Sequence, residues 1–231
     1  MTDGIAPGAK RRIISEAVGV GLAVSVVGLA FGGVAVTSGF SPIQAMVLSV
    51  FMFTGGSQFA LVSGLTAGGT AVAAIGVAWL LGSRNGLYAL RLRKVLPTKG
   101  PALWLGTHLV IDESTAMSVT RDDLSMARLG FWATGVSVFV GWNISTAIGA
   151  FAGSFVDDPG ALGLDAVFPA AFLALIWPQL RGRASVVTAC TAVALALALI
   201  PIAPRGVPVI ASSLATVAGA LVVRRNAIGR S

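Results

Sequence analysis

The chain has little of the charge that keeps a soluble protein in water. Only 11% of its 231 residues are charged, whereas 55% are apolar and the mean hydropathy is +0.88. Soluble domains carry about 25% charged residues, so a surface made from this sequence cannot be held in water. Most of the chain must therefore lie in lipid.

Cysteine and histidine are each present once, as Cys190 and His108. One cysteine cannot form an intrachain disulfide, and one histidine cannot build a histidine-rich metal site. The sequence has no phosphate-binding loop, dinucleotide fingerprint or metal-ligand cluster, which excludes a self-contained ATP-driven pump. We expect no cofactor, no metal and no enzymatic activity. A serine protease using Ser57 and His108 is disfavoured because Gln58 follows the serine where glycine is expected.

Basic residues outnumber acidic ones by sixteen to nine, which gives a net charge of +7. They form short clusters between apolar stretches and lack the interleaved aromatic residues of a nucleic-acid surface. This distribution is typical of the cytoplasmic loops of a membrane protein. It predicts that the N-terminal tail, residues 1–12, and the C-terminal tail, residues 224–231, both lie in the cytoplasm.

Long apolar stretches predict the transmembrane helices, since about 20 apolar residues are needed to cross ~30 Å of hydrocarbon. Two further apolar stretches, residues 42–65 and 101–119, are interrupted by polar and small residues. The six uninterrupted stretches are residues 13–36, 67–92, 129–153, 161–180, 184–200 and 207–223.

The basic cluster of Arg91, Arg93, Lys94 and Lys99 decides how the interrupted stretches are interpreted. If residues 42–65 crossed the membrane, this cluster would lie on the non-cytoplasmic side, against the positive-inside rule. A hairpin that enters and leaves on one side resolves the conflict, and residues 101–119 are interpreted in the same way. We expect an all-α polytopic integral membrane protein, one transporter domain over residues 1–231, with about six transmembrane helices and two re-entrant or broken segments. Eight crossings are the alternative.

A glycine-rich break is predicted within the first interrupted stretch, at residues 54–58. Irregular backbone at membrane depth is tolerated only where protein buries it or where it lines a water-filled cavity. Paired broken helices are typical of transporters, whose exposed helix ends bind charged groups of the substrate. The alternative is a packed helix that Gly55 and Gly56 merely kink.

Arg84 lies in an otherwise apolar stretch, where a charge costs at least ~2.5 kcal/mol unless it is paired or faces water. Asp112 and Glu113 are the nearest intramembrane anions in sequence, and a substrate carboxylate is the other candidate partner. An apolar environment disfavours the charged form of a carboxyl group, so this acidic pair is suited to carrying a proton. The alternatives are that Arg84 extends to the lipid headgroups and that the acidic pair lies in a solvated loop. His108 would share a face with Asp112 if the backbone between them were helical.

Small residues and tryptophans give weaker signals. The G-x-x-x-G spacing lets helix backbones approach closely, and it occurs at Gly28 with Gly32, Gly64 with Gly68 and Gly149 with Gly153. The tryptophans fall mostly near the ends of segments and are interpreted as membrane-interface anchors. They are Trp79, Trp104, Trp132, Trp142 and Trp177.

Four stretches together resemble the AzlC-type branched-chain amino acid permeases, the large subunit of the LIV-E exporters. The stretches are GFSPIQAMVLSVFMFTGGSQFALVSGL at 39–65, SRNGLYALRLRK at 83–94, IDESTA at 111–116 and GWNISTAIGAFAG at 141–153. The resemblance extends over nearly the whole chain and includes GLDAVFPAAFLAL at 163–175. The resemblance implies proton-driven export of leucine, isoleucine, valine and sometimes methionine or analogues across the bacterial cytoplasmic membrane. It also implies a small AzlD-type membrane subunit as partner.

The resemblance also implies which residues form the site. Gly55, Ser57 and Gln58 match one family element, Arg84 and Tyr88 a second, and Asp112 and Glu113 a third. This chain departs from the family pattern at Gly82, Asn85 and Ile111, which leaves Arg84 with one fewer local partner.

These residues together predict how a zwitterionic substrate binds. Its carboxylate is expected to meet Arg84 and the backbone N–H groups of Gly55 and Gly56, with Ser57, Gln58, Asn85 and Tyr88 completing the site. Asp112 or Glu113 is expected to take the ammonium group or the coupling proton. A non-transporting membrane scaffold and a passive channel for small neutral solutes are the alternative functions, and the number of copies in an assembly stays open.

Overall fold

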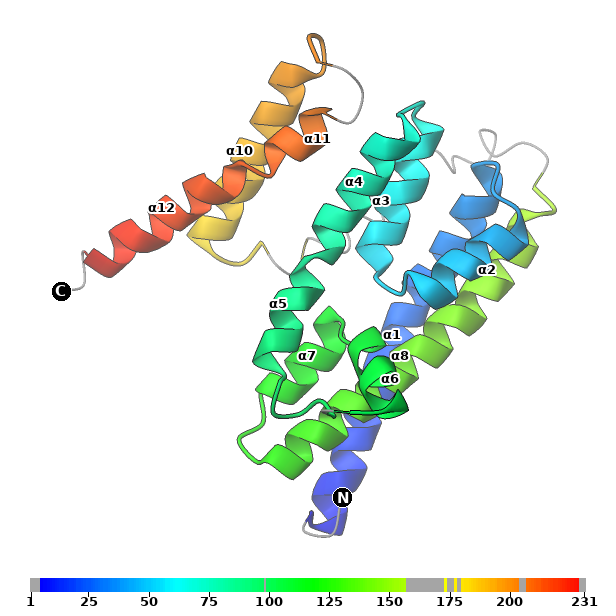
Figure 1. Ribbon diagram of the computed structural model, residues 1–231, viewed down its shortest axis with the longest axis vertical. Helices are drawn as coiled ribbons and strands as arrows, with labels where there is room; N and C mark the ends of the chain where they lie inside the picture. Colours follow the sequence, from blue (N-terminus) through cyan, green and yellow to red (C-terminus); the bar gives the residue numbers. More distant parts are fainter. Residues whose placement is uncertain are drawn as a thin grey trace.

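The computed structural model describes residues 5–97, 99–156, 180–203 and 207–228, together with residues 173 and 177. Every regular element in this part of the chain is a helix. Two helices are long and apolar enough to cross a membrane, α1 (Pro7–Thr37) and α8 (Leu124–Gly153). They run side by side in the same direction over most of their length (Figure 1).

Small residues bring α1 and α8 together. A Cβ atom at Gly32 would overlap the backbone of Thr146, and one at Gly149 would overlap the carbonyl oxygen of Leu29. Without side chains at these positions the two backbones come into direct contact, as expected where lipid tails provide no hydrophobic driving force. The predicted close approach through Gly28 with Gly32 and Gly149 with Gly153 is therefore confirmed, whereas Gly68 lies in a turn with φ +74°.

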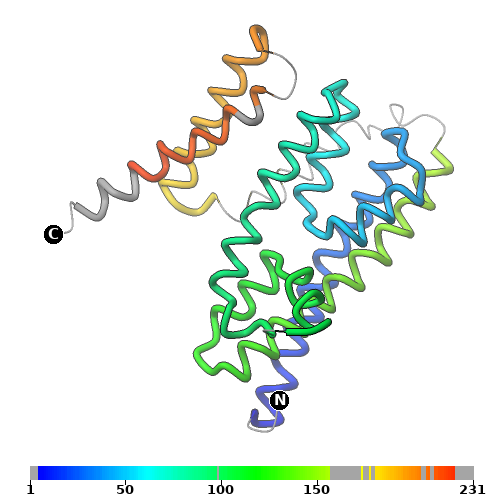
Figure 2. Tube along the Cα trace, viewed as in Figure 1, coloured from blue at the N-terminus to red at the C-terminus, as the bar shows by residue number. Residues whose placement is uncertain are grey.

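Residues 42–65 form two helices, α2 (Pro42–Phe51) and α3 (Gly55–Thr66). The helix α2 begins with a capping box in which Ser41 accepts from the Gln44 backbone N–H, and Pro42 occupies its first turn. In Figures 1 and 2, α2 runs from the end of α1 back toward the middle of the molecule, and α3 returns toward the same end. The predicted break lies at residues 52–54 rather than 54–58, because Gly55 already opens α3.

The second interrupted stretch also divides in two, α6 (Pro101–His108) and α7 (Asp112–Val119). The hydroxyl of Ser114 donates to the Leu109 carbonyl at 2.6 Å and accepts from the Ile111 N–H, which closes the turn between the helices. Figure 1 places both helices beside the half of the α1–α8 pair that is nearer the N-terminus. Asp112 and Glu113 therefore form the first turn of α7, not a solvated loop.

The remaining predicted crossings are shorter than expected or interrupted. Residues 67–92 become α4 (Ala71–Gly82) and α5 (Arg84–Arg91), with Ser83 between them. Residues 184–200 correspond to α10 (Arg183–Leu199), and residues 207–223 fall on α11 (Val207–Ser212) and α12 (Ala215–Ile228). The stretch 161–180 lies almost entirely outside the described residues. The number of crossings therefore stays a prediction.

Large apolar side chains cover the outside of the helices. Leu22, Val26, Ile43, Phe51 and Trp79 are each more than half exposed. So many large exposed apolar side chains are typical of a membrane or interaction surface. The buried interior is small by comparison and is built around Phe31, Phe59, Phe131 and Trp142.

Candidate functional site

The three predicted site segments meet at one cavity of about 210 Å³. It lies where α3 begins, where α4 gives way to α5, and where α7 begins. A cavity of this size holds several water molecules, since about 10–15 Å³ of such volume suffices for one. Its polar lining comprises Thr54, Gly55, Gly56, Arg84, Asn85, Asp112 and Glu113. Its apolar lining comprises Val24, Phe53, Leu81, Ile111, Val138 and Trp142.

Arg84 and Asp112 form an ion pair across the cavity. The Arg84 Nη2 atom lies 2.6 Å from Asp112 Oδ2, and the two side chains are 38% and 37% exposed. The guanidinium group is thus paired with Asp112, one of the partners that the sequence suggests for it. Its Nε atom is buried and has no hydrogen-bond partner among the described residues.

The first turn of α3 faces the same cavity without a side-chain cap. Thr54, at the N-cap position, makes no capping hydrogen bond with its side chain, so the N–H groups of Gly55 and Gly56 have no intrahelical partner. A Cβ atom at Gly56 would lie 3.9 Å from Arg84 Nη2, which places the guanidinium group directly beside this turn. The positive end of the α3 dipole and an arginine therefore act on the same space, an arrangement that attracts anions.

The acidic pair opens α7 on the other side of the cavity. Carboxylates are favoured in the first turn of a helix because they interact with its positive end. Asp112 is held by Arg84, whereas Glu113 has no ion-pair partner among the described residues. The two neighbouring carboxyl groups thus have different surroundings within one cavity.

Trp142 is a cavity residue that the sequence interpretation missed. It was predicted to anchor the membrane interface, but it is only 3% exposed, and its ring stacks on Phe31 with centroids 6.1 Å apart. A Cβ atom at Gly55 would lie 3.0 Å from Cη2 of this ring. The interface prediction is wrong for Trp142 because this residue lies in the middle of α8. Its position well inside the stretch 129–153 was the available signal.

Three predicted ligands do not line the cavity. Ser57 and Gln58 are almost fully buried, behind the first turn of α3. A Cβ atom at Gly82 would lie 3.3 Å from the Ser57 hydroxyl, which places Ser57 between α3 and α4. Tyr88 lies one turn after Arg84 on α5, near enough to Asp112 and Arg84 to interact with their charges. Ser57 and Gln58 thus support the first turn of α3 from the interior, and Tyr88 lies beside the Arg84–Asp112 pair.

His108 does not share a face with Asp112, because α6 ends at His108 and the backbone is not helical as far as residue 111. The His108 Nε2 atom lies 2.8 Å from the carbonyl oxygen of Val50, and the ring packs against Phe53 and Phe139. This histidine therefore joins α6 to α2. Its ring nitrogen is occupied by a backbone contact, which gives no support to a dyad with Ser57.

Comparison with known proteins gives a consistent result over most of the chain. The family described as AzlC protein matches residues 19–156, more than half of the sequence and all of the cavity-lining segments. An uncharacterized membrane protein of Archaeoglobus fulgidus is 32% identical over 191 residues, which is 82% of this chain and 84% of that protein. The inner membrane protein YgaZ of Escherichia coli K12 is 27% identical over 193 residues, 79% of this chain and 77% of YgaZ. No solved structure shows a significant match. The family match, supported by these relatives, shows that the chain is a membrane protein and belongs to the AzlC family.

Proposed function

We propose that this chain is the large subunit of a secondary exporter for branched-chain and related small apolar amino acids in the bacterial cytoplasmic membrane. Leucine, isoleucine and valine are the principal substrates, with methionine or analogues as further ones, and the proton motive force drives export. The observation that carries the proposal is the cavity, which combines a cation, a free helix end, two carboxyl groups and apolar walls.

A zwitterion matches the polar half of this cavity. The substrate carboxylate would take the place of Asp112 beside Arg84 and accept hydrogen bonds from the N–H groups of Gly55 and Gly56. The indole N–H of Trp142 and the hydroxyl of Thr54 are both buried without a partner in the described part of the chain. Each is therefore available to a ligand that enters the cavity.

Substrate binding would also free a carboxylate for coupling. When a substrate replaces Asp112 at Arg84, Asp112 and Glu113 are available to the ammonium group or to a proton. In the unloaded protein Asp112 thus occupies the position beside Arg84 that the substrate carboxylate takes on binding. Occupancy of the site is therefore linked to the protonation of the acidic pair.

The apolar half of the cavity determines which class of substrate side chain the proposed site accepts. Val24, Phe53, Leu81, Val138 and Trp142 provide no polar group except the Trp142 N–H. Such a wall discriminates one methylene by only ~1 to 3 kcal/mol, so a mixed profile of leucine, isoleucine and valine follows. Charged and strongly polar side chains would lose their hydration there without compensation.

The proposed assembly includes a small AzlD-type membrane subunit, and more than one copy of each chain is compatible with it. Both tails would lie in the cytoplasm, as the positive-inside rule predicts from Lys10, Arg11 and Arg12. Both relatives are named as membrane proteins, which supports a membrane location.

Thiol labelling of a cysteine placed at Lys99 distinguishes six crossings from eight, because six crossings keep this residue on the cytoplasmic side.

The test is valine transport by the chain and its small subunit reconstituted into liposomes. A gradient of one pH unit is worth about 1.4 kcal/mol, so each exchanged proton should support up to about tenfold accumulation of labelled valine. Lysine and glutamate are the control substrates and should not accumulate. Valine flux that never exceeds equilibration would indicate a passive channel, and a stable complex without flux would indicate a scaffold.

A further inference from the structure

Three buried hydroxyl groups lie near the cavity without a hydrogen-bond partner among the described residues. They belong to Thr115 and Ser118 on α7 and Thr134 on α8, which are 8%, 1% and 0% exposed. The neighbouring Ser114 is equally buried, yet it bonds to Leu109 and Ile111. Because an unsatisfied buried polar group is costly, such groups require an explanation.

On α8, the hydroxyl of Thr134 lies between the cavity and Arg121. Gly130, Thr134, Val138 and Trp142 are spaced by four residues, so each neighbours the next along the helix, and all four lie on its buried side. Val138 and Trp142 line the cavity. At the other end of this series, a Cβ atom at Gly130 would lie 3.6 Å from Cδ of Arg121. Thr134 is the one polar side chain in the series between these two points.

On α7, polar residues likewise lie between the cavity and Arg121. Asp112, Thr115 and Ser118 follow one another on α7 at intervals of three, and residues at this spacing on a helix are neighbours, with Cβ atoms about 5–6 Å apart. Arg121 follows the end of α7, and its backbone N–H donates to the Ser118 carbonyl at 3.2 Å. The helices α7 and α8 are in close contact, since a Cβ at Gly130 would touch the carbonyl of Met117, and α8 also packs on the turn before α7, where a Cβ at Gly135 would lie 3.0 Å from Cβ of Leu109. The hydroxyl-bearing residues of both helices therefore all lie in the region between the cavity and Arg121.

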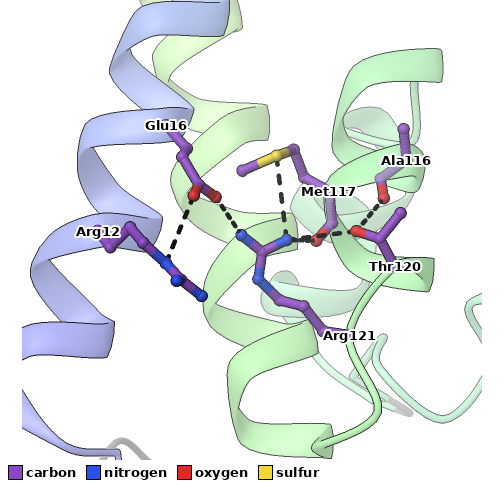
Figure 3. Close-up of polar contacts among 6 residues, drawn as sticks. All are labelled: Arg12, Glu16, Ala116, Met117, Thr120 and Arg121. Atoms are coloured by element: carbon purple, nitrogen blue, oxygen red, sulfur yellow. Dashed lines mark hydrogen bonds and ion pairs between the residues drawn. The ribbon is translucent and has the colours of Figure 1, made fainter.

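The outer end of this region carries a carboxylate that reaches solvent. Arg121 donates from Nη2 to Glu16 on α1 at 2.7 Å and from Nη1 to the carbonyl of Met117 (Figure 3). The Glu16 side chain is 44% exposed, and Arg12 lies 3.6 Å from its other oxygen. Glu16 is thus a carboxylate in contact with water near the N-terminal end of α1, with its charge balanced by two arginines.

We propose that Thr115, Ser118 and Thr134 form a proton route between the Asp112–Glu113 pair in the cavity and Glu16. This inference rests on the proposed function, since only a proton-coupled transporter needs such a route. Each hydroxyl accepts a proton on its oxygen from one neighbour or bridging water and releases its own proton to the next. One proton therefore leaves at one end for each that enters at the other, and no group in the route gains a lasting charge.

The route explains why hydroxyls occupy these positions at all. Valine has nearly the shape of threonine and would fill the same space without burying a polar group, so packing alone gives no reason for Thr115 and Thr134. A matched comparison follows, in which Thr115→Val and Thr134→Val remove the hydroxyl and Thr115→Ser and Thr134→Ser retain it. Ser118→Ala completes the set. Thr107→Val on α6 is the control, because that hydroxyl is exposed and bonds to Leu103 and Trp104.

The experiment measures two quantities in liposomes that contain the chain and its small subunit. Exchange of labelled for unlabelled valine at equilibrium requires the substrate site but no net proton movement. Valine-dependent proton movement, followed with a trapped pH dye, requires the route. We expect the Val and Ala variants to retain exchange and to lose proton movement by at least about tenfold, the Ser variants to restore it, and Thr107→Val to change neither.

Several results would overturn the route. Wild-type proton movement in the Val and Ala variants, with exchange intact, would overturn it and leave the proposed function standing. Loss of exchange and proton movement together, not restored by serine, would show a packing role instead. Exchange without any proton movement in the wild type would remove both the coupling and the route, whereas absence of exchange in the wild type would refute the proposed function itself.

Discussion

Arg84→Ala is expected to abolish concentrative valine efflux and to lower the thermal stability of the protein, while adding Asp112→Asn restores the stability but not the efflux. A hydrogen bond to a charged group contributes about 1.5–3 kcal/mol, so loss of the guanidinium should weaken carboxylate binding by roughly 10- to 150-fold. Removing the arginine also leaves Asp112 unpaired in the cavity. Both side chains are more than one third exposed, so the stability loss should be about 1–2 kcal/mol and below the 3–5 kcal/mol of a fully buried pair.

The double variant separates binding from structure. With Asp112→Asn no carboxylate is left without a partner, so a merely structural role for Arg84 predicts that equilibrium exchange of valine, which needs no coupling proton, returns together with stability, whereas a binding role predicts that exchange stays lost. Arg93→Ala is the control, because Arg93 is exposed and carries the same charge on the segment that follows α5. Efflux and equilibrium exchange in liposomes, together with thermal unfolding in detergent, are the measurements. Efflux by Arg84→Ala at the wild-type rate would remove Arg84 from the site.

Gly55→Ala is expected to reduce leucine efflux by at least about fivefold, and Trp142→Phe in the same chain is expected to restore part of it. The new methyl group would lie 3.0 Å from Cη2 of Trp142, closer than side chains ordinarily pack. The indole cannot readily move away, since it stacks on Phe31 and lies close to Gly28 of α1. Overpacking of this kind costs about 1–3 kcal/mol, equivalent to roughly 5- to 150-fold in an equilibrium.

The shorter ring of phenylalanine lacks the atom that the methyl group would meet. The two substitutions should therefore be coupled, with the double variant more active than Gly55→Ala alone, although Trp142→Phe by itself loses the indole N–H. Gly86→Ala on α5 is the control, because a Cβ atom there would have no neighbour within 4 Å. Independent, additive losses in the double variant would show that the contact between Gly55 and Trp142 does not shape the site.

The polar part of the site could be predicted from the sequence because it follows from local chemistry. An arginine in an apolar stretch requires an anion, and Asp112 was one of two candidates in the sequence; the structure places the two 2.6 Å apart. Glycines at a helix start likewise predict an open N-terminus, although the break itself lies a few residues earlier than expected. These inferences need only the cost of isolated charge and of unpaired backbone in lipid.

The rest of the site depends on which helices pack together, which one sequence does not specify. Trp142 reaches the cavity only because α8 runs beside α1 and brings its middle against Gly55. Ser57 and Gln58 follow Gly55 and Gly56 directly in the sequence, yet both are buried and do not line the cavity. The hydroxyls of Thr115, Ser118 and Thr134 look in the sequence like ordinary helix residues. Their burial without partners is visible only in the packed structure.

The central claim is that a small apolar amino acid binds in the cavity beside Arg84. Leu81 lines this cavity and has no polar role in it, so a cysteine at this position reports occupancy. The background is Cys190→Ser, because Cys190 is exposed and would react as well. The most direct test is the rate at which Leu81→Cys reacts with a water-soluble thiol reagent. Saturating leucine should slow the reaction, glutamate should not, and Arg84→Ala should remove the protection. A reaction rate unchanged by leucine, in protein that still exports it, would contradict the account.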